Sequence, residues 1–183
     1  MNTEFAHLVW GRFNPPTIGH KKLIEAAMKP YNNGKKFRKF VVLSETHNTK
    51  NNPLTVNQKT TILRKMINND IQIIKASKNN KMSTIFQILS RIQNKHPNIH
   101  FKIVLGGDYK GTRFANSLLK LNYVDSVNFV NRPHNAPSAT KLRKAASENN
   151  FTEARKLMNS TISNNNVKNI MKLIRNVQKL APL

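Results

Sequence analysis

The sequence predicts an α/β fold: a doubly wound parallel sheet of about five strands with helices on both faces, followed by C-terminal helices. Two observations predict it. Short apolar runs, typical of buried strands, alternate along the chain with longer runs whose apolar residues recur at helical spacing. The segments richest in Gly, Pro and hydroxyl residues follow the predicted strands, and strand ends are where sheets of this class bind ligands.

The expected strands are short and mainly aliphatic or aromatic. They cover residues 5–10, 37–44, 71–74, 100–105 and 126–130. A helix-like run follows each of the first four strands. Consecutive strands are therefore joined by crossovers rather than hairpins, which favours parallel pairing.

The expected helices carry apolar residues on one face. They cover residues 21–28, 54–66, 82–92, 113–121 and 138–146, and a helical tail over 151–180 has a polar break at 160–166. Thr55 and Ser138 are the expected N-caps, because a side-chain hydroxyl can accept a hydrogen bond from an early helical N–H. We expect one domain over residues 1–150 and a C-terminal helical extension, 151–183, packed on the same domain.

The chain is strongly basic. Its 183 residues include 31 Lys and Arg against 8 Asp and Glu, a formal net charge of +23. A field of this sign attracts polyanions such as nucleotides or nucleic acid. An AT-rich coding sequence that favours Lys and Asn explains the same composition, and the sequence leaves both explanations open.

Composition also excludes several classes of site. There is no Cys, so disulfides and thiolate metal sites are excluded. His7, His47, His96, His100 and His134 have no metal-ligand spacing, so we expect no metal site built by the protein. No apolar run is long enough to span a bilayer and no signal peptide is evident, so we expect a cytoplasmic protein with no membrane partner.

The most informative segment lies between the first predicted strand and the first predicted helix. Residues 11–20 read Gly-Arg-Phe-Asn-Pro-Pro-Thr-Ile-Gly-His. The first N–H groups of a helix have no intrahelical partner and form an anion site. His20 stands at this helix start, where its imidazole can face a bound phosphate.

This segment resembles the signature of the nucleotidyltransferase superfamily, Gly-x-Phe-(Asp/Asn)-Pro-x-(His/Thr)-x-Gly-His, with Thr17 in the His/Thr position. Ser138, Thr140 and Arg143 resemble the second signature of that superfamily, Ser-x-Thr-x-x-Arg, although Pro137 precedes it where Ile or Val is usual. The resemblance implies a Rossmann-like domain. It also implies transfer of a nucleoside monophosphate from a nucleoside triphosphate to a phosphorylated acceptor, with release of pyrophosphate.

The resemblance assigns roles to individual residues. It implies that His20, Thr17 and Arg143 are catalytic, acting on the phosphates. The nucleotide-binding residues that it implies are Gly11, Arg12, Phe13, Asn14, Gly19, His20, Ser138, Thr140 and Arg143. Gly107 and Asp108 stand in a Gly-x-Asp at a strand end and are expected at the acceptor. Trp10 is expected there too, with core packing as the alternative.

A further segment, residues 52–59, resembles the Asn-Pro-Leu-Ser/Thr segment of phage-borne nucleotidyltransferase-like proteins. In several superfamily members this region shapes the acceptor pocket. A capped surface helix is the alternative. Arg12 and Lys21 flank the first signature as further candidates for phosphate contacts.

Two functional hypotheses follow. The first is an enzyme that uses ATP or CTP, with Mg²⁺ carried by the triphosphate. Adenylyl transfer is favoured over cytidylyl transfer, and nicotinamide mononucleotide is an example of the acceptor. The second is a basic nucleic-acid- or virion-associated protein that keeps the fold, located in the host cytoplasm or the virion if it is phage-encoded. The sequence does not give the oligomeric state.

Overall fold

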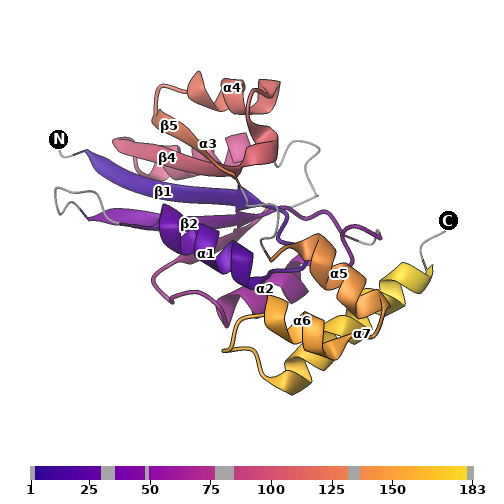
Figure 1. Cartoon of the computed structure of the whole chain (residues 1–183). Helices are drawn as coiled ribbons and strands as arrows, with labels where there is room; N and C mark the ends of the chain where they lie inside the picture. Colours follow the sequence, from indigo (N-terminus) through magenta and orange to yellow (C-terminus); the bar gives the residue numbers. More distant parts are fainter. Residues whose placement is uncertain (1–2, 30–35, 48–49, 77–84, 132–136, 181–183) are drawn as a thin grey trace.

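The computed structural model describes residues 3–29, 36–47, 50–76, 85–131 and 137–180. Five strands form one parallel sheet in the order β3-β2-β1-β4-β5 (Figure 1). The strands are β1 (Glu4–Gly11), β2 (Phe37–Leu43), β3 (Gln72–Lys75), β4 (Ile99–Gly106) and β5 (Val124–Val130). The chain winds outward from β1 to β3, then crosses to β4 on the other side of β1. The fold class expected from the sequence is confirmed.

Helices cover both faces of the sheet. Against one face lie α1 (Ile18–Ala27) and α2 (Val56–Arg64). Beyond them α5 (Ala139–Ser147), α6 (Phe151–Leu157) and α7 (Asn164–Leu180) pack on one another and join the same buried cluster (Figure 1). Against the other lie α3 (Ile85–Lys95) and α4 (Arg113–Leu119). A 3-10 turn, η1 (Gly107–Tyr109), follows β4.

The apolar runs of the central strands serve two cores at once. Successive side chains of a strand point to opposite faces. Val9 of β1 therefore belongs to the core under α1 and α2, and Leu8 to the core under α3 and α4. In β2, Val41 and Val42 divide in the same way. Strands buried on both faces need continuous apolar sequence, which explains why these runs do not alternate with polar residues.

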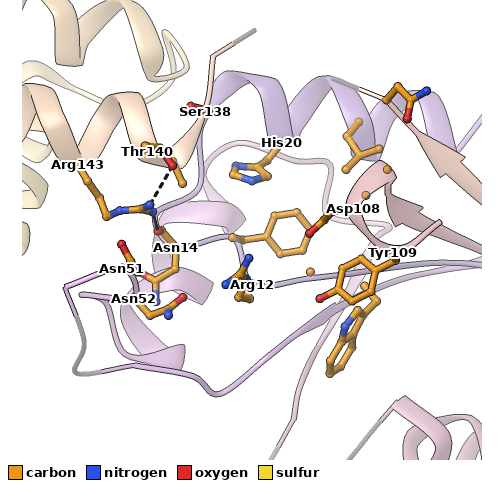
Figure 2. A pocket seen from close by; sticks show the side chains of 18 residues that line it. Arg12, Asn14, His20, Asn51, Asn52, Asp108, Tyr109, Ser138, Thr140 and Arg143 are labelled. Carbon is orange, nitrogen blue, oxygen red and sulfur yellow. Dashed lines mark hydrogen bonds between the residues drawn. The ribbon is translucent and has the colours of Figure 1, made fainter. Parts of the chain in front are cut away.

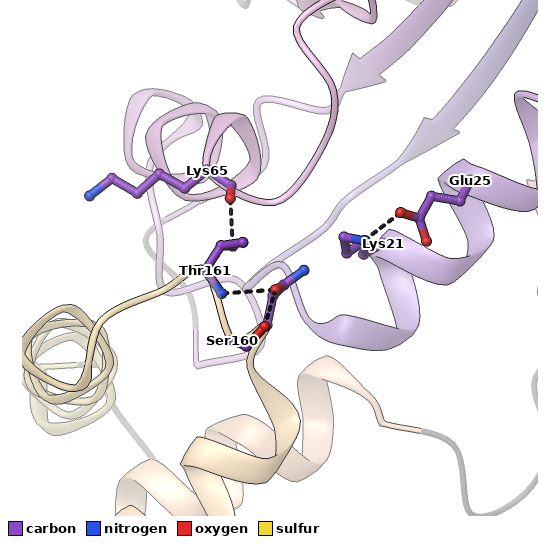
Figure 3. A network of polar contacts seen from close by, with 6 residues as sticks. Lys21, Glu25, Lys65, Ser160 and Thr161 are labelled. Atoms are coloured by element: carbon purple, nitrogen blue, oxygen red, sulfur yellow. Dashed lines mark hydrogen bonds and ion pairs between the residues drawn. The ribbon is translucent and has the colours of Figure 1, made fainter.

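The C-terminal helices share the core of the sheet. Leu157 of α6 and Val167 of α7 lie in the same buried cluster as Val9. The turn between these helices is fastened to α2, because the Thr161 hydroxyl donates to the Lys65 carbonyl at 2.6 Å (Figure 3). The Asn159 side chain accepts from the Thr161 backbone N–H at 2.9 Å and so holds this turn in shape.

Some element limits differ from those expected. Helix α1 begins three residues early, at Ile18, because Thr17 is in extended conformation and serves as its N-cap. Helix α7 begins at Asn164, inside the expected polar break, where the Ser163 hydroxyl accepts from the Asn166 N–H at 3.3 Å. Residues 82–84 of the third expected helix, and residues 132–136 between the fifth expected strand and the fifth expected helix, lie outside the described residues.

Two predicted helix caps are confirmed. Thr55 accepts from the Gln58 N–H at 3.3 Å and Ser138 from the Lys141 N–H at 3.2 Å. Among the described helices, none combines the length and apolar character that a bilayer crossing requires.

Candidate active site

A cavity of about 740 Å³ opens at the carboxyl ends of the strands (Figure 2). It lies at the carboxyl ends of β1 and β4, the two neighbouring strands between which the winding direction of the sheet reverses. In open α/β sheets, ligands bind in the crevice at this position. Both signature segments reach it. The residues that line it are Trp10, Gly11, Arg12, Phe13, Asn14, His20, Leu23, Asn51, Asn52, Gly106, Gly107, Asp108, Tyr109, Asn131, Ser138, Ala139, Thr140 and Arg143.

His20 is held in one orientation on the cavity wall. Its Nδ1 accepts a hydrogen bond from the Thr17 backbone N–H at 3.0 Å, and the Thr17 hydroxyl lies 3.0 Å from the same nitrogen. The ring of Phe13 meets the imidazole edge-on at 5.0 Å. A backbone N–H can only donate, so Nδ1 is the acceptor and the proton of the neutral ring resides on Nε2. The side chain is only 4% exposed.

Thr17 stands behind His20 instead of beside it. It has no exposed surface and does not line the cavity. The expectation that its hydroxyl reaches the phosphates is therefore wrong for this geometry, because the hydroxyl is turned to the imidazole. In this geometry Thr17 orients His20.

Gly19 also lies off the cavity, contrary to the expected nucleotide contact. A Cβ at this position would lie 2.3 Å from the carbonyl oxygen of Pro137. The missing side chain lets the first turn of α1 touch the chain that enters α5. Gly19 thereby brings the two signature segments together, rather than bringing the backbone close to a ligand.

Asn14 uses its side chain to fix the loop after β2. Its Nδ2 donates to the carbonyls of Thr46 at 3.2 Å and Leu54 at 2.9 Å, and its Oδ1 accepts from the Leu54 N–H at 2.9 Å. This loop carries Asn51 and Asn52 on the cavity wall. The segment over residues 52–59 thus reaches the cavity at its start.

The two signatures are bonded through Arg143. Its Nη1 donates to the Asn14 carbonyl at 2.9 Å and its Nη2 to the Thr140 hydroxyl at 3.0 Å (Figure 2). Burial lowers the pKa of the Arg143 guanidinium, and the positive charge of Arg12 lowers it further. Two guanidinium groups repel each other at a site that holds them together, and a bound polyanion relieves that cost.

The cavity wall carries more positive than negative charge. Arg12 and Arg143 line it together with His20, and Asp108 is the single acid among the lining residues. Lys21, in contrast, forms an ion pair with Glu25 one turn along α1 and does not line the cavity (Figure 3). The wall is therefore electrostatically suited to anionic groups such as phosphates.

The β4 and β5 ends supply a second, more apolar part of the wall. Gly107 and Asp108 line this part of the wall. Trp10 of β1 lines the cavity too, and its ring centroid lies 6.5 Å from that of Phe114. Tyr109 packs on the same Phe114 ring at 5.4 Å. Trp10 is thus both a packing residue and a cavity residue, and contact of these residues with an acceptor stays a prediction.

Several lining residues were missed at the sequence level. Tyr109 directly follows Asp108, and Asn131 directly follows β5. The rule that ligands meet strand ends could have found both. Asn51 carries no such signal, because its place depends on the Asn14 side chain.

The donor set suits an ion that arrives on a triphosphate. The described residues hold no group of three or more His, Cys, Asp or Glu that could cage a metal. Mg²⁺ commonly takes one or two carboxylates together with substrate phosphates and water. Asp108 supplies one carboxylate at the wall, so the residues present fit Mg²⁺ in that mode.

Solved structures of similar fold include proteins described as adenylyltransferases. A protein assigned as a nicotinate-nucleotide adenylyltransferase from Vibrio parahaemolyticus matches with a TM-score of 0.59 and 19% identity, covering 94% of this chain and 96% of its own. The Plasmodium falciparum nicotinic acid mononucleotide adenylyltransferase complexed with APC matches with a TM-score of 0.62 and 16% identity, covering 93% and 98%. At these identities the likeness concerns the fold.

The sequence itself gives the family. No curated protein sequence matches the chain. The model of the family described as cytidylyltransferase-like matches residues 8–145, the span that contains both signatures and every residue of the cavity wall. The chain belongs to the cytidylyltransferase-like family of nucleotidyltransferase-type proteins.

Proposed function

We propose that the chain is a Mg²⁺-dependent nucleotidyltransferase that transfers a nucleoside monophosphate from a nucleoside triphosphate to a phosphorylated small molecule. The observation that carries the proposal is the meeting of the two signatures in one cavity. His20 from the first lies on the same wall as Arg143 from the second, and Arg143 is bonded to the Asn14 carbonyl at 2.9 Å.

In the proposed reaction, a phosphate oxygen of the acceptor attacks the α-phosphorus of the nucleotide. The new P–O bond forms as the bond from the α-phosphorus to the bridging oxygen breaks, and pyrophosphate leaves with the electron pair. The acceptor phosphate is already ionised at neutral pH, so no base is required. The protein contributes positioning and stabilisation of charge.

The cavity residues can position the phosphates and stabilise their charge. The Nε2–H of His20 can donate to a non-bridging oxygen of the α- or β-phosphate, since Nδ1 is already used as an acceptor. Arg12 and Arg143 can each give paired donors to phosphate oxygens. Mg²⁺, when bound with the triphosphate, supplies neutralisation of the phosphate charge, and Asp108 is the carboxylate that would share in holding it.

Adenylyl transfer is the favoured form, with cytidylyl transfer as the alternative, and a pyridine mononucleotide such as nicotinamide mononucleotide is the favoured acceptor. Two lines support this preference. The Plasmodium falciparum enzyme of similar fold has been solved complexed with NaAD. The rings of Trp10 and Tyr109 also give the cavity flat apolar surfaces on which an aromatic ring can stack.

The test is pyrophosphate release by the full chain with Mg²⁺, ATP or CTP, and a panel of phosphorylated acceptors. Release should require one acceptor and should fall by about 10²-fold or more in His20→Ala, the usual effect of losing a charge-stabilising donor. His100→Ala is the matched control, because His100 is partly exposed on β4 and pairs with Asp125 at 2.7 Å. A folded protein that releases no pyrophosphate with any pair would refute the proposal.

A second candidate function is binding of nucleic acid, alone or together with catalysis, in a cell or a virion. The observation that favours it is the net charge of +23. The cavity wall uses only two of the arginines, so nearly all of this charge lies outside the proposed nucleotide site.

A further inference from the structure

Lys59 on α2 carries a fully buried ammonium group. Its exposed fraction is 0%, and it is among the largest wholly buried side chains. Removing an ammonium from water is costly unless hydrogen bonds replace its hydration. The groups that provide those hydrogen bonds therefore reveal what this side chain holds in place.

The ammonium joins two chain segments as they leave the sheet. Its Nζ donates to the Arg12 carbonyl at 3.1 Å and to the Ser44 carbonyl. Strands β1 and β2 end at Gly11 and Leu43, so these are the first residues beyond two neighbouring strands. The Ser44 N–H also donates to the Gly11 carbonyl at 3.1 Å, directly beside the ammonium bonds.

The bonded turn leads straight into the cavity. Arg12 lines the cavity, and two residues later the Asn14 carbonyl accepts from Arg143. Two cationic side chains, Lys59 from α2 and Arg143 from α5, thus hold two carbonyls of one short turn, two residues apart. The backbone position of this turn decides where the Arg12 guanidinium stands relative to Arg143.

We propose that Lys59 is a positioning residue for phosphate binding: its protonated amine fixes the Arg12 carbonyl, and thereby sets the Arg12 side chain beside Arg143 in the cavity. This proposal rests on the proposed function, since the ligand is taken to be a nucleoside triphosphate. Lys59 itself does not line the cavity and acts through the main chain.

The charge state of Lys59 can change within an accessible pH range. Burial lowers its pKa to about 8, and the charge of Glu45 opposes that shift. The other charged groups at α2 are engaged elsewhere: Lys75 of β3 donates to the Asn57 side chain and Arg64 to the Ile71 carbonyl. Loss of the proton removes the charge-assisted part of the bonds to Arg12 and Ser44.

The effect of Lys59 deprotonation on ATP affinity can be separated from its effect on the stability of the fold. The pKa of Lys59 falls from 10.5, the ordinary value, to about 8 in the folded chain. Between these values the unfolded state binds more protons, so this group raises the free energy of unfolding as the pH rises. A loss of triphosphate affinity across pH 8 therefore cannot come from Lys59 destabilising the fold.

The test compares Lys59→Met, which keeps the length and loses the charge, with Lys59→Arg, which keeps the charge. Lys65→Met is the control, because Lys65 is exposed at the end of the same helix. Calorimetry with ATP and Mg²⁺ between pH 7 and 9 measures the affinity for ATP. The rate of hydrogen exchange at the Ser44 amide measures how firmly the residues after β1 and β2 are held together, because this amide donates to the Gly11 carbonyl. ATP phosphates are fully ionised in this range, since the last phosphate pKa is about 6.

We expect Lys59→Met to bind ATP about 10-fold or more weakly at pH 7, the effect of one charge-assisted hydrogen bond. We expect the ATP affinity of the wild type to decline above pH 8, and the ATP affinity of Lys59→Met not to change there. The Ser44 amide of Lys59→Met should exchange faster than that of the wild type. Lys59→Arg should retain part of the affinity, and Lys65→Met should behave as the wild type.

The outcomes separate this proposal from the proposed function. Unchanged exchange at Ser44 in Lys59→Met overturns the positioning role, whether or not ATP binds. A second outcome is that the Ser44 amide exchanges faster in Lys59→Met while the wild type binds neither ATP nor CTP. In that case Lys59 does hold the turn, and the nucleotidyltransferase proposal is overturned. If Lys59→Met does not fold, a pH-independent ATP affinity of the wild type across pH 8 overturns the positioning role.

Discussion

At the residue scale, several side chains of the first signature hold other parts of the site in place. Thr17 orients His20, and Asn14 holds the loop after β2. His20 and Arg12 of this segment line the cavity, and His20 is at the same time bonded to Thr17 through Nδ1. The signature is therefore a folding unit as much as a binding motif.

Asn14 gives a sharp test, because the signature accepts Asp or Asn at this position while the contacts here require an amide. In Asn14→Asp, a buried carboxylate would face the carbonyls of Thr46 and Leu54 in place of two N–H donors. We expect the free energy of unfolding, measured in urea at pH 7, to fall by about 2–4 kcal/mol.

The pH dependence of Asn14→Asp checks the cause. Facing carbonyls raises the pKa of the new carboxyl above its unfolded value of about 3.9. The deficit should therefore shrink as the pH falls through the raised folded pKa, where the protonated group regains one donor. Asn116→Asp on the exposed side of α4 is the control and should change little. A variant as stable as the wild type at pH 7 would show that the loop is not held by these bonds.

At the element scale, the active-site geometry depends on one close approach between α1 and the start of α5. Replacing Gly by Ala inside a helix usually stabilises a protein by about 0.5–1 kcal/mol. At Gly19 the new methyl would lie 2.3 Å from a backbone oxygen, which cannot rotate away as a side chain can. The two elements must then separate.

We therefore expect Gly19→Ala to lower the free energy of unfolding by about 1–3 kcal/mol, the typical effect of overpacking. ATP affinity should also fall, since His20 and Arg143 move apart. Ser117→Ala on the exposed side of α4 is the matched helical control and should be neutral or slightly stabilising. Stabilisation of Gly19→Ala would mean that α1 and α5 tolerate a wider spacing.

Prediction from sequence succeeded where a local pattern decides the structure. The apolar runs gave the five strands, and the Gly/Pro-rich segment after the first strand located the cavity. It failed at the local turn of Thr17 toward His20, and where long-range contacts decide: the packing of Gly19 on Pro137 and the burial of Lys59. A lysine between polar residues reads as surface charge, and only the folded chain brings the Arg12 and Ser44 carbonyls to its ammonium.

At the scale of the whole molecule, the question is what the net charge of +23 does. The cavity wall uses two arginines, and 8 acids can neutralise only a small part of the charge of 31 Lys and Arg, so most of the positive charge remains to attract polyanions. Binding of nucleic acid through such scattered charge requires no sequence and releases counterions at each phosphate contact.

We expect the full chain to bind a short DNA duplex of arbitrary sequence, with an observed affinity that falls steeply as salt rises. The log–log slope should be steeper than about −5, which corresponds to several neutralised phosphates. Fluorescence anisotropy over a series of salt concentrations measures this slope.

The controls are His20→Ala and saturating ATP. His20→Ala should leave the slope unchanged, because one neutral ring on the cavity wall contributes to no release of counterions. Saturating ATP should displace little DNA. A flat salt response would remove nucleic-acid binding and leave coding bias as the source of the charge. A steep slope that ATP abolishes would place the DNA in the cavity, and the triphosphate affinity would then reflect general anion binding there.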